Sequence, residues 1–310
     1  MRDPAVSIVI GAYNMARELP RTIRSLSPTM QRDVDATDYE VIVVDNGSTV
    51  AVDVDACRRW GADVRVLRIP PQDASHSPVQ ALNAGIEMAR GELIGVMIDG
   101  ARLASPGLLA SALLADRVAA RPVILTLGFH LGPRVQMESV RQGYDQGVED
   151  RLLENAEWTE DGYRLFDVAV FAGSSANGWF RPINESNALF LRREAWDALQ
   201  GFDQRFVAPG GGYANLDLLE RAVHLPGATV VTVLGEGTFH QVHGGVATNA
   251  TEDMTVVFNA EYRSIRGRDF QTVAYQSVYV GWVADNALQS IAASCETAVR
   301  ASRSAPAAAV

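Results

Sequence analysis

Short apolar runs alternate with amphipathic stretches along the first 130 residues of the chain. The runs are rich in Val, Ile and Leu with few polar interruptions, which is typical of strands buried on both faces of a parallel sheet. The stretches between them have helical spacing, so the pattern predicts repeated strand–helix units. The expected strands are 6–11, 39–45, 64–69, 93–98 and 123–129, and the expected helices are 17–25, 52–61, 78–89 and 106–120.

The rest of the chain is less regular. Residues 132–178 contain one expected helix near 148–157, which indicates an insertion rather than a separate domain. Further elements are expected as a strand at 187–191, a helix at 193–199, a helix at 214–223 after a Gly-rich segment, and a strand at 229–234. Residues 252–299 are predicted to be helical, and the Ala/Ser-rich tail after 302 to be disordered.

Polar residues follow several of the expected strands. Ala12, Tyr13 and Asn14 follow the first strand, Asp45 opens an Asp-Asn-Gly-Ser segment after the second, and Asp99 follows the fourth. Ligands of parallel sheets bind outside the carboxyl ends of the strands. The sequence therefore predicts a binding site at this edge of the sheet.

Charge and composition exclude several classes of protein. The 310 residues include 27 basic and 37 acidic side chains, for a net charge of -10, and every basic residue is Arg. We therefore do not expect a nucleic-acid-binding surface. The absence of Lys excludes a Walker-type phosphate loop and Schiff-base chemistry. No G-x-G-x-x-G follows the first strand and no G-x-S-x-G occurs, which disfavours an oxidoreductase and a serine hydrolase.

Cysteine content, apolar run length and the N-terminal residues bear on where in the cell the protein is found. Cys57 and Cys295 form no CxxC and are expected to be reduced thiols. No apolar run approaches the ~20 residues that a bilayer requires. The N-terminus enters a strand directly, without a signal peptide. We expect a cytoplasmic protein with no integral membrane segment.

Four segments in order resemble the family 2 glycosyltransferases, nucleotide-sugar-dependent enzymes with a GT-A fold: SIVIGAYN, YEVIVVDNGST, ALNAGIEMARGELIGVMIDGA and NALFLRREAWDALQGFDQRF. The resemblance covers most of positions 5–250. It implies an α/β fold, a Rossmann-like, mostly parallel sheet flanked by helices. The domains implied are a GT-A domain at 1–250 with a nucleotide-binding half at 1–130 and an acceptor half at 131–250, a helical C-terminal extension at 251–300, and a disordered tail at 301–310.

The resemblance also implies which residues hold the donor. Asp45 would accept a hydrogen bond from the base, which a carboxylate can do, or would only close an Asx turn. Tyr13 would cover the base or be a core ring, and Asn83 would contact sugar or phosphate or be a solvated helix residue. The full set of donor-binding candidates is Ala12, Tyr13, Asn14, Asp45, Asn83, Asp99 and Arg102.

A divalent cation is implied at Asp99, the position of the family's DXD motif. Asp99-Gly100-Ala101-Arg102 keeps only the first carboxylate of that motif. His240 and His243 offer replacement ligands, and imidazole favours Mn²⁺ over Mg²⁺. The alternatives are that both histidines bind backbone carbonyls, and that Arg102 neutralises phosphate without a metal.

The acceptor side departs from the family's pattern. Its usual Glu-Asp pair, which supplies the base, reads Ala214-Asn215 here, and an amide cannot take a proton at neutral pH. Asp217 and Glu220 are the nearest carboxylates and are candidate bases. Without a base, Asn215 would bind acceptor or sugar in a retaining reaction. Further acceptor-binding candidates are Arg181, Glu185 and Gly212, and the alternative for the first two is a structural ion pair between them.

The leading hypothesis is a hexosyltransferase of carbohydrate biosynthesis. It would use a nucleoside diphosphate sugar, with UDP favoured, a divalent cation, and a hydroxyl acceptor that is a small molecule or glycan. The alternative is a catalytically impaired GT-A-like module that binds nucleotide sugars. A nucleotidyltransferase ranks last, because GAYNMARELP is a poor phosphate loop. The sequence leaves a homodimer open.

Overall fold

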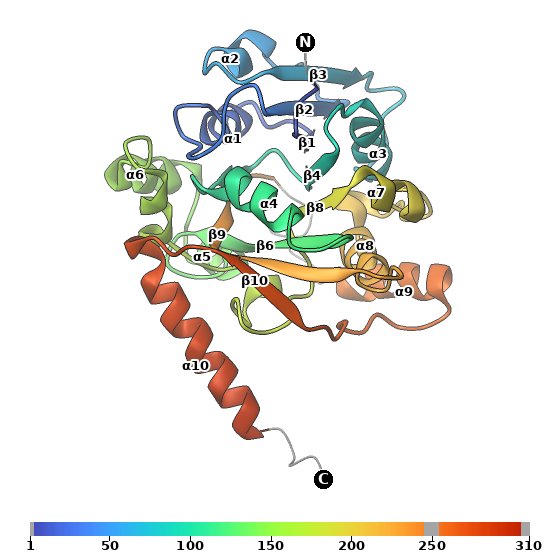
Figure 1. Cartoon of the computed structure of the whole chain (residues 1–310). Helices are drawn as coiled ribbons and strands as arrows, with labels where there is room; N and C mark the ends of the chain where they lie inside the picture. The colour runs from blue at the N-terminus through green and yellow to red at the C-terminus, as the bar shows by residue number, and fades with distance from the viewer. Residues whose placement is uncertain (1–2, 245–253, 305–310) are drawn as a thin grey trace.

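The computed structural model describes residues 3–244 and 254–304. Within these ranges the strands are β1 Val6–Ala12, β2 Tyr39–Asn46, β3 Val64–Ile69, β4 Leu93–Met97, β5 Arg102–Ala104, β6 Pro122–Leu131, β7 Ala169–Phe171, β8 Ala188–Arg192, β9 Thr229–His240 and β10 Ser277–Gly281. They form one ten-stranded sheet in the order β10-β9-β6-β8-β4-β1-β2-β3, with β5 on β9 and β7 on β6 (Figure 1).

Helices cover both faces of this sheet. They are α1 Leu19–Ser25, α2 Val54–Arg58, α3 Val79–Met88, α4 Leu108–Asp116, α5 Gln136–Arg141, α6 Gln146–Ala156, α7 Arg193–Leu199, α8 Ala214–Val223, α9 Thr255–Arg266 and α10 Leu288–Ser304. Apolar side chains of α1, α2 and α4 pack in one core cluster, and those of α3, α7 and α8 pack in the other. The sheet is therefore the middle layer of three, and α10 extends away from it (Figure 1).

The sequence of β1 explains why the sheet is covered twice. Successive side chains of a strand point to opposite faces. Val6, Ile8 and Ile10 enter the core with α1 and α4, whereas Val9 enters the core with α3. Each of these four side chains is at most 1% exposed, so the continuous apolar run reflects burial on both faces.

The predicted α/β fold class is confirmed, and the differences lie in the second half. Residues 277–281, predicted to be helical, form the edge strand β10, which pairs in parallel with β9. This short Ser-Val-Tyr-Val-Gly run is compatible with either structure, and its β-branched residues fit the sheet edge. The insertion contributes β7 to the same sheet. Helix α10 continues to Ser304, and the rest of the predicted tail lies outside the described residues.

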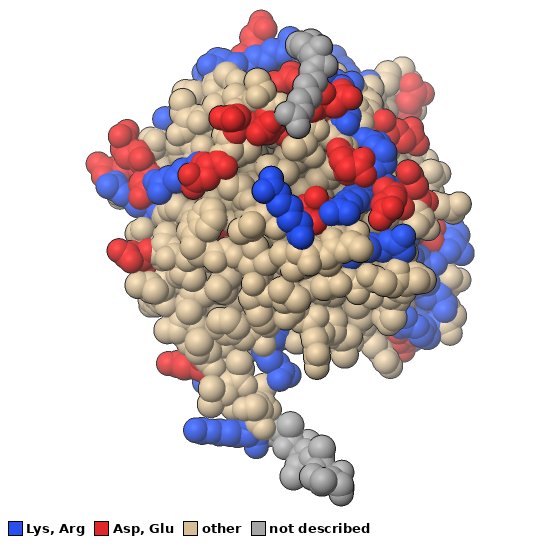
Figure 2. All heavy atoms as spheres, in the orientation of Figure 1, with Lys and Arg blue, Asp and Glu red and all other residues tan. Residues whose placement is uncertain are grey.

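One side of the molecule is largely uncharged. Figure 2 shows charged side chains over the upper part, near β2 and β3, and few charges over β6, β9 and β10. Val278, Tyr279 and Trp282 on and after β10 are each at least 40% exposed. No helix among the described residues is long and apolar enough to cross a bilayer. The edge strand thus presents apolar side chains to solvent.

Strand direction brings distant residues to one edge. β1, β2 and β4 are parallel, β6 and β9 are parallel, and β8 lies antiparallel between β4 and β6. The carboxyl ends of β1, β2, β4, β6 and β9 therefore share one edge, and β8 begins there. Because Met97 pairs with Ala188, the residues just before β8 run alongside those just after β4.

Candidate active site

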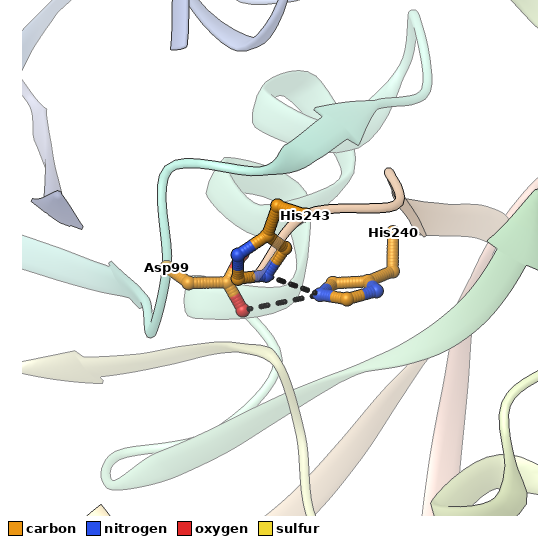
Figure 3. A group of neighbouring side chains, drawn as sticks. All are labelled: Asp99, His240 and His243. Carbon is orange, nitrogen blue, oxygen red and sulfur yellow. Dashed lines mark hydrogen bonds and ion pairs between the residues drawn. The ribbon is translucent and has the colours of Figure 1, made fainter. Parts of the chain in front are cut away.

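Asp99, His240 and His243 come together at this edge. Asp99 follows β4, His240 ends β9, and His243 lies in the loop after it (Figure 3). The two Nε2 atoms are 3.1 Å apart, and His240 Nε2 lies 3.8 Å from Asp99 Oδ2. One donor atom from each residue lies within 4.8 Å of the others. The structure thus brings together the three residues predicted to bind a cation.

The environment of His240 favours a metal-binding imidazole. Its Nδ1 is 2.5 Å from the Oε1 atom of Gln136 on α5, so Nδ1 carries the proton and Nε2 keeps its lone pair. Burial, and then the neighbouring charge of Arg102, hold the pKa of His240 well below its usual value. A neutral imidazole with Nε2 aimed at Asp99 is the form that binds a cation.

Arg102, the first residue of β5, contacts the same carboxylate. Its Nε donates to Asp99 Oδ2 at 3.0 Å, and the Ala101 backbone N–H donates to Oδ1 at 3.0 Å. Burial, the largest single influence, raises the pKa of Asp99, but the Arg102 guanidinium, the two imidazoles and the Ala101 N–H together outweigh it and hold that pKa below its usual range. The Nη1 atom of Arg102 is buried and has no hydrogen-bond partner among the described residues. A buried donor atom without a hydrogen-bond partner is costly, so Nη1 favours a ligand that offers an acceptor, such as an anion.

The donor set fits a divalent cation. Two ligands at about 2.1 Å from one ion and at right angles lie about 3 Å apart, which matches the 3.1 Å between the Nε2 atoms of His240 and His243. Each oxygen of Asp99 accepts one hydrogen bond and keeps a second lone pair. Imidazole and carboxylate together favour Mn²⁺ and similar ions over Mg²⁺.

Helix α6, which belongs to the insertion at 132–178, is hydrogen-bonded to the loop that carries His243. Glu149 of α6 accepts a 2.7 Å hydrogen bond from the Val242 backbone N–H, and Arg17 pairs with the same carboxylate at 3.1 Å. Burial raises the pKa of Glu149 to about 7. A cavity of about 600 Å³ lies between this helix and the loop, with Tyr144 and His243 in its lining. Sequence reasoning missed Gln136 and Glu149, because no spacing relates them to the histidines.

The ends of β1 and β2 are joined by side chains. Asn14 accepts from the Thr49 backbone N–H at 2.9 Å, and its own N–H donates to Ser48 Oγ at 2.9 Å. Asp45 is buried and accepts from Ser48 N at 3.0 Å and Val52 N at 3.3 Å, which is the turn-closing role weighed from the sequence. Tyr13 is 55% exposed, so its ring is free to cover a ligand and is not a core ring.

Asn83 is used by the turn after α7. Its amide donates to the Phe202 carbonyl oxygen and accepts from the Phe202 N–H, both at 2.9 Å. This pair of bonds fixes the Gly201-Phe202 turn against α3, with Gly201 at a φ of 66°. We therefore assign Asn83 a positioning role in the turn, in place of the sugar or phosphate contact predicted from the sequence.

The two predicted bases are held by arginines. Asp217 is 1% exposed and binds Arg221 at 2.8 Å and Arg266 at 2.5 Å. Glu220 binds Arg268 and the hydroxyl of Tyr262. A buried carboxylate paired with two guanidinium groups is a poor proton acceptor. We therefore assign Asp217 and Glu220 structural roles, in place of the predicted catalytic one.

Asn215 and Glu185 are hydrogen-bonded to each other at the sheet edge where β8 begins. Asn215, in the first turn of α8, donates to Glu185 Oε2 at 3.0 Å and to the Ser186 carbonyl oxygen at 3.3 Å. Glu185 precedes β8 and therefore lies at the edge that carries Asp99. Neither it nor Arg181 takes part in an ion pair within the described chain, so the alternative of a structural pair between them is not observed.

Arg181 and Gly212 occupy different surroundings. Arg181 is exposed and lines a cavity of about 320 Å³ together with Phe180, Tyr275 and Tyr279. Gly212 precedes α8 at a φ of 52°, and a Cβ there would lie 3.0 Å from Glu261 Oε2. The positive φ favours glycine at this position.

Comparison with known proteins relates part of this chain to glycosyltransferases. Residues 7–99 match the family described as Glycosyl transferase family 2. Two curated relatives from Streptomyces hygroscopicus, of subspecies jinggangensis (strain 5008) and limoneus, are both named validoxylamine A glucosyltransferase. Each is 28% identical over 218 residues, which is 67% of this chain and 49% or 46% of the relative. The chain thus spans about half the length of the curated relatives it matches.

Solved structures confirm the fold. The TarS fragment 1-349 of S. aureus in complex with UDP-GlcNAc aligns with a TM-score of 0.55 at 15% identity, over 84% of this chain and 65% of that one. The same fragment in complex with UDP gives a TM-score of 0.52 at 13% identity, over 84% and 70%. At such low sequence identity the likeness concerns the fold alone, and it confirms the predicted GT-A fold.

Proposed function

We propose that this chain transfers a glycosyl group from a nucleoside diphosphate sugar to a hydroxyl acceptor, because residues 7–99 match the family described as Glycosyl transferase family 2 and the curated relatives are named glucosyltransferases. The observation that carries the proposal is the Asp99, His240 and His243 cluster with the unpartnered Nη1 of Arg102 beside it. Asp99, His240 and His243 would hold a divalent cation, which would supply Lewis-acid neutralisation of the diphosphate. Arg102 supplies a second positive charge for the same phosphates.

The nucleotide is assigned to the ends of β1 and β2. Tyr13 offers an exposed ring for the base, and Asp45 keeps lone pairs beyond those used by its loop. Ala12 ends β1, and the Asn14 N–H that follows it donates to Ser48 in the adjoining segment. UDP is the proposed nucleotide and glucose the proposed sugar, since the curated relatives are named glucosyltransferases and TarS is recorded with UDP. Validoxylamine A, in the name of those relatives, is the first acceptor to test.

Nucleotide binding is the first test of this function. We expect UDP to raise the melting temperature of the protein more in the presence of Mn²⁺ than in EDTA, because a ligand of the folded state stabilises it. At 100 times the dissociation constant the gain is about 2.7 kcal/mol. The same measurement with GDP and dTDP compares the three nucleotides. The proposal fails if no nucleotide shifts the melting temperature and no nucleotide sugar is cleaved with or without metal.

Arg102→Gln is expected to weaken binding of UDP about 10- to 150-fold, since a hydrogen bond to a charged group contributes about 1.5–3 kcal/mol. The loss should depend on phosphate, so uridine should bind both proteins equally. Isothermal titration with UDP and uridine measures the difference. Arg134→Gln, which removes an exposed arginine paired with Glu138, is the control. Equal affinity of the wild type and Arg102→Gln for UDP would contradict the assignment.

A further inference from the structure

Most carboxylates at the sheet edge that carries Asp99, His240 and His243 already form ion pairs or accept backbone hydrogen bonds. Asp99 binds Arg102, and Asp45 is buried under two backbone N–H groups. Glu149 pairs with Arg17 and the Val242 N–H. Glu185 differs, because it is only partly buried and its one hydrogen bond within the described chain comes from the neutral amide of Asn215. No arginine or histidine side chain is paired with this carboxylate within the described chain.

Chain direction places Glu185 on the side of Asp99 opposite to the nucleotide end. Strands β1 and β2 lie on one side of β4, and β8 lies on the other. Met97 pairs with Ala188 in antiparallel register, so the residues that follow Met97 run beside those that precede Ala188. A donor that extends from β1 and β2 across Asp99 would therefore present its sugar toward the segment that carries Glu185.

On the basis of the proposed function, we propose that Glu185 is the catalytic base and that Asn215 positions it. The acceptor oxygen forms a bond to the anomeric carbon while the bond from that carbon to the diphosphate oxygen breaks. The bonding electrons leave with the diphosphate, and the hydroxyl proton passes to a carboxylate oxygen of Glu185. No further reactant is required.

Asn215 suits the positioning role. Its Nδ2 donates both to Glu185 Oε2 and to the Ser186 carbonyl, which ties the carboxylate to the first turn of α8. Asn215 is 8% exposed, so its amide is held within a packed surrounding. An amide donor holds the carboxylate without adding a cation that would suppress proton acceptance.

The experiment separates proton removal from donor binding. UDP-glucose, UDP-N-acetylglucosamine and GDP-mannose are offered with water as acceptor, and nucleotide release is measured for the fastest donor. Glu185→Gln is expected to lose about 10²- to 10⁴-fold of this release, the usual contribution of a general base. Sodium azide, an anionic nucleophile that has no proton to lose, should restore release and yield the glycosyl azide. UDP should raise the melting temperature of the variant as it does for the wild type.

Two further variants keep the test decisive. Glu154→Gln, which changes an exposed glutamate on α6, should retain wild-type release. Glu185→Gln combined with Asn215→Asp should recover part of the lost rate, because the new carboxylate lies about one hydrogen bond away from the old one. Wild-type release by Glu185→Gln, or loss of release that azide does not restore, overturns the assignment. A wild type that binds UDP but cleaves no donor in water would also overturn it, whereas absence of both UDP binding and donor cleavage would instead reject the proposed function.

Discussion

His243→Ala is expected to lower Mn²⁺-dependent donor cleavage on the order of 100-fold or more, since even residues that only support metal ligands are worth 10–100-fold. His243 supplies one of the two imidazole nitrogens that lie 3.1 Å apart. Without it, Asp99 and His240 remain as a pair next to the positive charge of Arg102. The measurement is nucleotide release as a function of Mn²⁺ concentration, with bound Mn²⁺ followed by electron paramagnetic resonance.

His224→Ala provides the matched control for this experiment. His224 is exposed at the end of α8, where its ring contacts the Glu220 carbonyl oxygen at 2.7 Å. Its removal should leave the Mn²⁺ dependence unchanged. In EDTA the wild type and His243→Ala should cleave donor at the same low rate. A wild type indifferent to EDTA, or a His243→Ala protein with wild-type Mn²⁺ dependence, would exclude the metal at this cluster.

The sheet and its polar edge could be predicted because they depend on local pattern. Apolar runs such as 39–45 identify strands buried on both faces, and parallel direction brings their ends together. Asp99 was identified by its place after such a strand, and the histidines by resemblance to the family. The residues that orient the histidines were not found, because Gln136 and Glu149 precede His240 and Val242 by about a hundred residues.

The two candidate bases show a different limit of the sequence. Asp217 is the nearest carboxylate to the expected base position, and it lies on the helix predicted at 214–223, which the structure confirms as α8. Its partner Arg266 lies 49 residues later on α9, where no local pattern connects the two. Glu185 and Asn215 are likewise 30 residues apart. Whether a carboxylate is held by a cation or by an amide depends on tertiary contacts, which the order of residues does not reveal.

Asp217→Asn should lower the free energy of unfolding by about 3–5 kcal/mol, the usual cost of removing one partner of a buried ion pair. Asp217 binds Arg221 of α8 and Arg266 of α9, and Arg266 also reaches Asp203 at 2.9 Å. An amide leaves two guanidinium groups without their shared counter-charge. Urea denaturation measures the change, and Asp197→Asn, an exposed position on α7, should stay within about 0.5 kcal/mol of the wild type.

The same variant separates a structural ion pair from a catalytic base. If Asp217 is structural, the folded fraction of Asp217→Asn should cleave donor at a rate close to that of the wild type at low temperature. A base would give the opposite result, a stable protein with slow cleavage and unchanged UDP binding. Because Arg221 also donates to the Leu199 and Gly201 carbonyl oxygens, loss of the pair should loosen the turn that Asn83 holds. Hydrogen exchange at Phe202 should therefore accelerate, a change that loss of a base alone would not produce.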